Sequence, residues 1–215
     1  MEYLTENQLR AALIYTCDLM IASEPMLTEL DSIIGDGDHG IGMRDGFSDL
    51  KDKLVSSGFN SIYELLMETG TQLVKSMGGA SGVIFGTLFI GGREAVKGKD
   101  RINADDLILF FEESAINIAR RGRTGPGDRT MLDALLPAID SMKESRKLTK
   151  SIEVILEAAY KGALRGVENT KNMIPRLGRA KNFREKAIGY ADPGAVSLSV
   201  IFKGLSEGIR KINRE

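Results

Sequence analysis

Apolar residues recur every three or four positions along most of this chain, which is the period of an amphipathic α-helix. The first apolar stripe consists of Leu9, Leu13, Cys17, Met20 and Ile21. It follows a Thr-x-x-Gln sequence at 5–8 that is typical of a capping box. Similar stripes predict helices after segment 35–42, from about 61, over about 81–96, after 103, from about 128, over about 151–170 and from 192. No sustained alternation of apolar and polar residues is present, so the pattern predicts an all-α protein of about eight helices.

Prolines mark where several of these helices begin, break or bend. Pro25 is expected to interrupt the first helix, and Pro137 to bend the sixth. Asp192 followed by Pro193 is typical of a helix start, with the aspartate as N-cap and the proline at the first helical position. No repeat, low-complexity stretch or linker divides the chain, so residues 1–215 are expected to form one domain.

Glycines collect between the predicted helices, in 35–42, 78–82, 122–127 and 189–194. Glycine at a helix start lets the backbone approach another group closely. Helix N-termini carry free amides and partial positive charge. Several such N-termini gathered at one end of the molecule would therefore form an anion-binding mouth.

Charge and composition narrow the class of protein. The net charge is −1, with 29 basic and 30 acidic residues, so nothing indicates a nucleic-acid or anionic-membrane partner. The single Cys17 is expected to be a buried small hydrophobe, and one cysteine fits a reducing compartment. No apolar run reaches about 18 residues, and no basic segment followed by an apolar one opens the chain. We therefore expect a cytoplasmic protein.

Three aspartates lie close together, at Asp31, Asp36 and Asp38. Carboxylates at this spacing repel one another unless a cation lies between them. Mg²⁺ prefers oxygen ligands and completes its shell with water and phosphate oxygens. The run therefore indicates a metal site for a polyphosphate, with an ordinary solvated turn as the alternative. A calcium EF-hand is less favoured, because the later ligands are missing.

The same run contains Gly35-x-Gly37-x-x-Gly40, which matches the spelling of the dinucleotide fingerprint. That fingerprint requires a preceding strand and a neutral loop. The preceding residues show no strand alternation, and two aspartates occupy the loop, so we regard the match as accidental. His39, the only histidine, is either structural or a neutral donor to a phosphate.

The remaining glycine-rich segments each have two readings. Segment 78–82, with Ser81, is either a phosphate-binding helix start or a tight turn. Segment 122–130 resembles a Walker A loop but has Asp128 where the lysine belongs, so that reading fails. Met131 is either core or an apolar surface for a flat base. Segment 174–192 is polar and aperiodic, which fits a linker or a mobile lid over a phosphate site.

Taken together and in this order, the sequences Gly-Asp-Gly-Asp-His-Gly, Gly-Gly-Ala-Ser-Gly, Gly-Asp-Arg-Thr-Met-Leu-Asp and Asp-Pro-Gly-Ala resemble the nucleotide-binding L subunit of dihydroxyacetone kinase. The resemblance covers almost the whole chain. It implies an all-α barrel of eight antiparallel helices that binds ADP or ATP and two Mg²⁺ ions at one rim. It also implies an apolar cavity inside the barrel.

The resemblance assigns roles position by position. It implies that Asp31, Asp36 and Asp38 are the Mg²⁺ ligands and, with Arg179, the catalytic groups. It implies a phosphate cradle made of His39, Gly40, Ile41, Gly42, Ala80 and Ser81. It implies adenosine contacts from Gly122 and Met131, and a closing lid that includes Arg179, Ala191, Asp192 and Pro193. The family commonly has Asn after Thr or Ile, where this chain has Gly42, so one side-chain amide is missing.

The family also implies partners. The ketose substrate is held on a separate K subunit through a histidine there, and an M subunit passes phosphate from the phosphotransferase system to ADP on L. Two alternatives stay open: a subunit of an ATP-dependent kinase for erythrulose or another short ketose, and a non-catalytic nucleotide sensor. Three intact aspartates favour catalysis over sensing.

Overall fold

The computed structural model describes residues 1–214, and helices make up most of that range. Its nine α-helices, counted within that range, are α1 (Glu6–Ala22), α2 (Glu24–Ile34), α3 (His39–Ser56), α4 (Ile62–Met77), α5 (Gly79–Ile90), α6 (Ala104–Gly122), α7 (Leu132–Arg146), α8 (Ile152–Thr170) and α9 (Pro193–Ile212). Short 3-10 turns occupy η1 (Arg93–Val96), η2 (Arg179–Asn182) and η3 (Arg184–Ala187). Two strands, β1 (Tyr3–Thr5) and β2 (Arg101–Asn103), pair antiparallel. The expectation of an all-α protein is confirmed.

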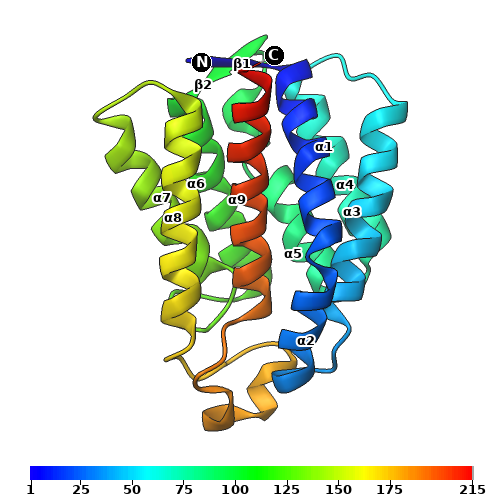
Figure 1. The fold of residues 1–215 in the computed structure, drawn as a ribbon, viewed down its shortest axis with the longest axis vertical. Coiled ribbons are helices and arrows are strands. Elements are labelled where there is room, and N and C mark those ends of the chain that lie inside the picture. Colours follow the sequence, from blue (N-terminus) through cyan, green and yellow to red (C-terminus); the bar gives the residue numbers. More distant parts are fainter. Residues whose placement is uncertain (215) are drawn as a thin grey trace.

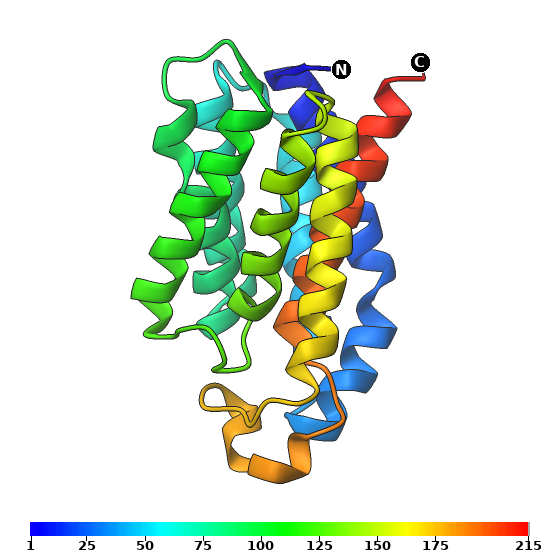
Figure 2. The ribbon, with the colours of Figure 1, turned by 90° about the vertical axis from the view of Figure 1, so that its left-hand side faces the viewer.

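Eight of the helices form a closed ring. Going around it, α1 packs on α3, α3 on α4, α4 on α5, α5 on α6, α6 on α7, α7 on α8, α8 on α9, and α9 back on α1. Neighbours in the ring run in opposite directions, as Figures 1 and 2 show. The remaining helix, α2, lies outside the ring and packs against α3 and α9. The antiparallel eight-helix barrel implied by the resemblance is therefore confirmed.

Alternation of direction brings four helix starts to one end. The N-termini of α3, α5, α7 and α9 lie at the lower end in Figure 1, together with α2 and the segment between α8 and α9. We call this end the rim. The strand pair and both chain ends lie at the opposite end. The four glycine-rich segments thus meet at the rim, as the sequence predicts.

Five elements differ from the sequence-based expectation, among them α7, which begins at Leu132 and not near 128. Pro25 does not merely interrupt the first helix: it lies in the first turn of a separate helix, α2, joined to α1 through Ser23. The strands were not expected, because three residues are too few to show alternation. The fourth predicted helix ends at Ile90 instead of 96, and the separate turn η1 follows it. Gly92 lies between the two, where an added Cβ would be 1.9 Å from the carbonyl oxygen of Phe110.

Glycines also serve inside helices, which the sequence analysis missed. A Cβ added to Gly166 in α8 would lie 2.3 Å from the carbonyl oxygen of Asp133 in α7. A Cβ at Gly204 in α9 would lie 2.6 Å from the Cα of Thr16 in α1. Because glycine has no side chain, it lets α8 approach α7 and α9 approach α1 closely. Glycine in this chain serves helix packing as well as helix starts.

The interior of the ring is filled mainly by aromatic and aliphatic side chains. Phe47, Phe89, Phe111 and Phe202 are almost wholly buried, and so is Cys17. The apolar cavity implied by the resemblance is present but measures about 20 Å³, little more than a water-sized space. Among residues 1–214, none of the helices combines the length and the hydropathy needed to cross a membrane.

Candidate functional site

The three predicted metal ligands meet at the rim. Asp31 lies in the last turn of α2, and Asp36 and Asp38 lie in the turn that leads to α3. One carboxylate oxygen from each comes within 4.8 Å of the others. Asp31 is buried, whereas the other two face solvent. Three oxygens at this spacing, in a cluster that is open to solvent on one side, fit a hard divalent cation that also contacts phosphate or water.

Electrostatics in this turn favour a cation. The pKa of Asp38 is raised, first by the partial loss of water around this exposed carboxyl and then by the negative charges of Asp36 and Asp31. The backbone at Gly35 passes so close to Asp31 that only glycine fits: an added Cβ would lie 2.1 Å from Oδ1 of Asp31. Gly37 has φ of 75°, a conformation that favours glycine. The glycines therefore let the chain fold back so that its carboxylates converge.

His39 connects this turn to α9. Its backbone N–H donates to Oδ2 of Asp31 at 3.2 Å, and its ring Nε2 lies 2.8 Å from Oγ of Ser197. Its ring centroid is 6.3 Å from that of Phe85 in α5. Burial lowers the pKa of His39, partly opposed by the charge of Asp31, so the imidazole is neutral at pH 7. Ser197, 158 residues away in sequence, was not singled out by sequence analysis.

The predicted lid arginine reaches the aspartates. We call residues 171–191, between α8 and α9, the lid; it contains η2 and η3 and hangs below the ring in Figure 2. Nε of Arg179 lies 3.0 Å from Oδ2 of Asp36, although most of the Arg179 side chain is exposed. The structure therefore brings Arg179 and the carboxylates together. An exposed ion pair alone contributes little to stability. The contact therefore shows where Arg179 lies but does not indicate a strong interaction.

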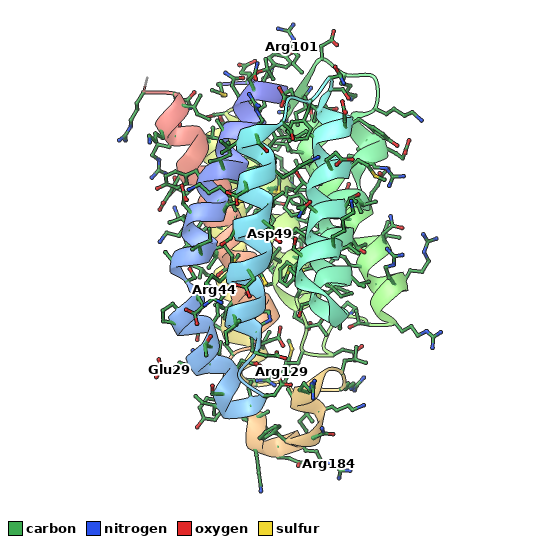
Figure 3. The ribbon with its side chains drawn as sticks, turned by 90° about the vertical axis from the view of Figure 1, so that its right-hand side faces the viewer. Glu29, Arg44, Asp49, Arg101, Arg129 and Arg184 are labelled. Carbon is green, nitrogen blue, oxygen red and sulfur yellow. The ribbon has the colours of Figure 1, made fainter. Side chains whose placement is uncertain are left out.

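The base of the lid is held by a residue that sequence analysis missed. Arg129, in the loop between α6 and α7, is 2% exposed. Its Nε donates to the carbonyl of Thr170 at 3.2 Å, and its Nη2 donates to the carbonyls of Ala187 at 3.3 Å and Tyr190 at 2.8 Å. Figure 3 shows Arg129 between the helix ends and the lid, with Arg184 at the lid's outer edge. No sequence signal distinguishes a buried loop arginine from an exposed one.

The same loop is braced by two aspartates. Oδ1 of Asp133 accepts from the N–H of Gly127 at 2.6 Å and its Oδ2 from the N–H of Thr130 at 2.8 Å. Asp128 accepts from the N–H of Gly125 at 2.8 Å, and its other oxygen lies 3.2 Å from Nη1 of Arg176 in the lid. Asp128, which replaces the Walker lysine, therefore connects this loop to the lid.

The predicted adenosine and phosphate contacts lie around the same rim. Gly122 ends α6, where an added Cβ would be 3.3 Å from Cδ1 of Ile84 in α5. Met131 is 3% exposed, and a Cβ at Gly194 in α9 would be 3.8 Å from its Cβ. Ala80 and Ser81 lie in the first turn of α5. The rim segments of α3, α5, α6, α7 and α9 are thus linked by contacts.

The start of α9 closes the site. Asp192 is the N-cap of this helix: its Oδ2 accepts from the N–H of Ala195 at 2.8 Å, as predicted. Burial, assisted by the charges of Asp133 and Asp31, raises the pKa of Asp192 to about 6. Ala191 and Pro193 on either side are buried. Gly42 has open space beside it: no atom lies within 4 Å of an added Cβ.

Comparison with known proteins places this arrangement in a family. The DAK2 domain matches residues 33–207. The chain is 37% identical over 189 residues to the ADP-binding subunit DhaL of the PEP-dependent dihydroxyacetone kinase of Escherichia coli, covering 88% of this chain and 90% of that one. It is 28% identical over 201 residues to the L-erythrulose kinase of Pectobacterium atrosepticum, covering 91% of this chain but 34% of that one.

Solved structures agree with this placement. The native dihydroxyacetone kinase of C. freundii superimposes with a TM-score of 0.74 at 26% identity, covering 95% of this chain and 35% of that one. The same kinase in complex with AMP-PNP and Mg²⁺ gives a TM-score of 0.73 at 26% identity, with 96% and 35% covered. The chain therefore spans about a third of those chains.

Proposed function

Because the chain belongs to the DAK2-domain family and is a nucleotide-binding kinase subunit of the DhaL type, we propose that it carries ADP or ATP with two Mg²⁺ ions and passes the terminal phosphate to dihydroxyacetone held on a separate K subunit. The observation that carries the proposal is the convergence of Asp31, Asp36 and Asp38 at the rim, with Arg179 of the lid on Asp36. Pure nucleotide retention needs fewer acidic groups than this.

Each part of the rim has a role in this proposal. Asp31, Asp36 and Asp38 hold Mg²⁺, which when bound neutralises phosphate charge. Within the cradle of His39, Gly40, Ile41 and Gly42 at the start of α3, the N–H groups of His39 and Gly42 are already bonded to Asp31 and Asp38. The N–H groups of Gly40 and Ile41, and those of Ala80 and Ser81 at the start of α5, would therefore bind phosphate oxygens. Gly122 and Met131 lie against the adenosine. Phosphoryl transfer depends mainly on positioning and charge neutralisation, which these groups supply.

Arg179 and the lid would complete the site. The guanidinium of Arg179 already lies at Asp36, so phosphate oxygens near this carboxylate come within its reach. A positive charge there offsets the negative charge that develops during transfer. Ala191, Asp192 and Pro193 join the lid to α9 and thereby to the cradle. Closing of the lid would also keep water from the phosphate.

Among residues 1–214, no side chain at the rim is an evident base for a ketose hydroxyl, because the three clustered aspartates are assigned to the metal. The chain's only histidine, His39, is half-buried, has a lowered pKa and is hydrogen-bonded to Ser197. Activation of the substrate therefore falls to another chain, the K subunit. The name of the Escherichia coli relative describes an ADP-binding subunit of a PEP-dependent kinase. It supports an M subunit of the phosphotransferase type that rephosphorylates ADP on this chain.

Reconstitution tests the proposal. The chain alone should not phosphorylate dihydroxyacetone; with a cognate K subunit and a phosphorylated M subunit it should turn over with only catalytic amounts of ADP. Multiple turnovers with free ATP and no M would instead favour the ATP-dependent kinase for erythrulose or another short ketose, which the likeness to the L-erythrulose kinase supports. Failure with every ketose and K subunit would favour a nucleotide sensor.

A further inference from the structure

The lid is a loop whose two ends are fastened together while its tip reaches across the rim. The N–H of Gly189 donates to the carbonyl of Lys171 at 2.8 Å, and the N–H of Asp192 donates to Oγ1 of Thr170 at 3.0 Å. The tip carries Arg179 to Asp36. The base and the tip of the lid can therefore be considered separately.

Arg129 enters this base from another loop. Its three hydrogen bonds reach both sides of the base: the carbonyl of Thr170 at the end of α8, and the carbonyls of Ala187 and Tyr190 before α9. The carbonyls of Thr170 and Ala187 also accept backbone N–H groups, from Met173 at 3.1 Å and from Tyr190 at 3.3 Å, so Arg129 is a second donor to each. A single buried guanidinium thus connects the α6–α7 loop to both ends of the lid.

Arg129 is an unexpected residue for this position. Its backbone has φ of 60°, the left-handed region where glycine or asparagine fits with less strain. Its guanidinium is buried, which lowers its pKa and disfavours the charge it carries. Within residues 1–214, its buried Nη1 has no hydrogen-bond partner. Strain and desolvation together at one residue point to a role beyond filling space.

We propose that Arg129 is a positioning residue that fixes the base of the lid, so that Arg179 is held at Asp36 and nucleotide release is slow. The part concerning nucleotide release rests on the function proposed above. The Arg179–Asp36 pair is too exposed to hold the lid by itself. If the base is loose, the tip samples more positions, and bringing Arg179 to the site requires a larger loss of conformational entropy.

The test compares Arg129→Met and Arg129→Lys with Arg184→Met. Arg184 is the matched control because it also has a left-handed backbone, with φ of 50°, but lies exposed on the outer edge of the lid. Two readouts are needed: hydrogen exchange at the amides of Gly189 and Asp192 without nucleotide, and the dissociation rate of a fluorescent ADP analogue with Mg²⁺.

With Arg129→Met we expect faster exchange at both amides and dissociation about 10-fold faster or more, the size expected when hydrogen bonds from a charged group are lost. Exchange in the centres of α1 and α9 should not change. Arg129→Lys should be intermediate, since one ammonium cannot reach all three carbonyls. Arg184→Met should behave as wild type.

Two results would overturn the inference. One is wild-type exchange and dissociation in Arg129→Met. The other is loss of protection throughout the helical ring, which would make Arg129 a general structural residue; if Arg129→Met fails to fold, the same comparison in Arg129→Lys decides. The exchange readout needs no nucleotide. If the wild type does not bind the ADP analogue, the proposed function is wrong. The exchange rates of the lid-base amides still test whether Arg129 fixes the base of the lid.

Discussion

At the scale of single residues, the three rim aspartates have different surroundings. Asp31 is buried and accepts the backbone N–H of His39, so its orientation is set by the start of α3. Asp36 faces the lid through Arg179. Asp38 has a raised pKa from the partial loss of water around it and from its acidic neighbours. The cluster therefore has one fixed oxygen donor and two that can adjust to a ligand.

We expect Asp36→Ala to lose bound nucleotide and phosphoryl transfer while keeping its helix content. The substitution removes a metal ligand, but it also relieves repulsion among carboxylates, so the fold should not weaken. Bound nucleotide after gel filtration and far-UV circular dichroism measure the two effects. Asp49→Ala, at an exposed position of α3, is the control. Wild-type nucleotide content in Asp36→Ala would refute the metal assignment.

Asp192 predicts a pH dependence of stability. Its pKa is raised to about 6 in the folded protein, above the value of about 3.9 for an unfolded chain, so folding takes up a proton between these values. The stability contributed by this group is therefore complete below about pH 4 and lost as pH rises through about 6. Asp192→Asn retains an N-cap but does not titrate.

The measurement is urea unfolding of both proteins between pH 4 and 7 without Mg²⁺. Wild type should lose stability relative to Asp192→Asn across pH 4 to 6. A difference that does not vary with pH would show that the carboxyl titrates normally.

At the scale of elements, glycines decide how closely neighbouring helices pack. Gly162 and Gly166 in α8 face α7, and Gly204 and Gly208 in α9 face α1. In each case an added Cβ would lie within 3 Å of an atom of the facing helix. Close approach allows eight helices to form a ring that their side chains fill almost completely. The helix starts at the rim are brought together by the same packing.

Alanine substitution should therefore have opposite effects at two glycines. Gly166→Ala should lower stability by about 1–3 kcal/mol, because its Cβ would lie 2.3 Å from the carbonyl oxygen of Asp133 and overpack the contact. Gly42→Ala, in α3 with no atom within 4 Å of the new Cβ, should raise stability by up to about 1 kcal/mol through helix propensity. Urea denaturation of both variants checks this. Equal signs would contradict the packing argument.

At the scale of the whole molecule, the rim combines segments that are distant in the chain: His39 and Ser197, which are in contact, are 158 residues apart. A ligand that contacts several of these segments would hold them together. A ligand at 100 times its Kd stabilises the native state by about 2.7 kcal/mol. For a domain of this size, each kcal/mol raises Tm by roughly 2–4 °C. ADP with Mg²⁺ should thus raise Tm by roughly 5–10 °C, and ADP with a chelator much less. Equal shifts in thermal unfolding would exclude a metal-bridged phosphate.

The sequence by itself determined what depends on near neighbours. The capping box at Thr5 and Gln8 and the N-cap at Asp192 were predicted correctly, because a cap bonds residues two or three positions away. The aspartate cluster was predicted for the same reason: its members span eight positions, from the last turn of α2 to the residue before α3. Apolar periodicity likewise predicted most of the helices, since each buries one face.

Only the tertiary structure decided which distant groups meet. The contact of His39 with Ser197, the burial of Arg129 under the lid, and the packing role of Gly166 each depend on a facing element that local sequence does not specify. The separate helix α2 was missed because Pro25 is compatible with both a break and a helix start. Burial is a property of the closed ring, so residues that act through burial become visible only when the ring is assembled.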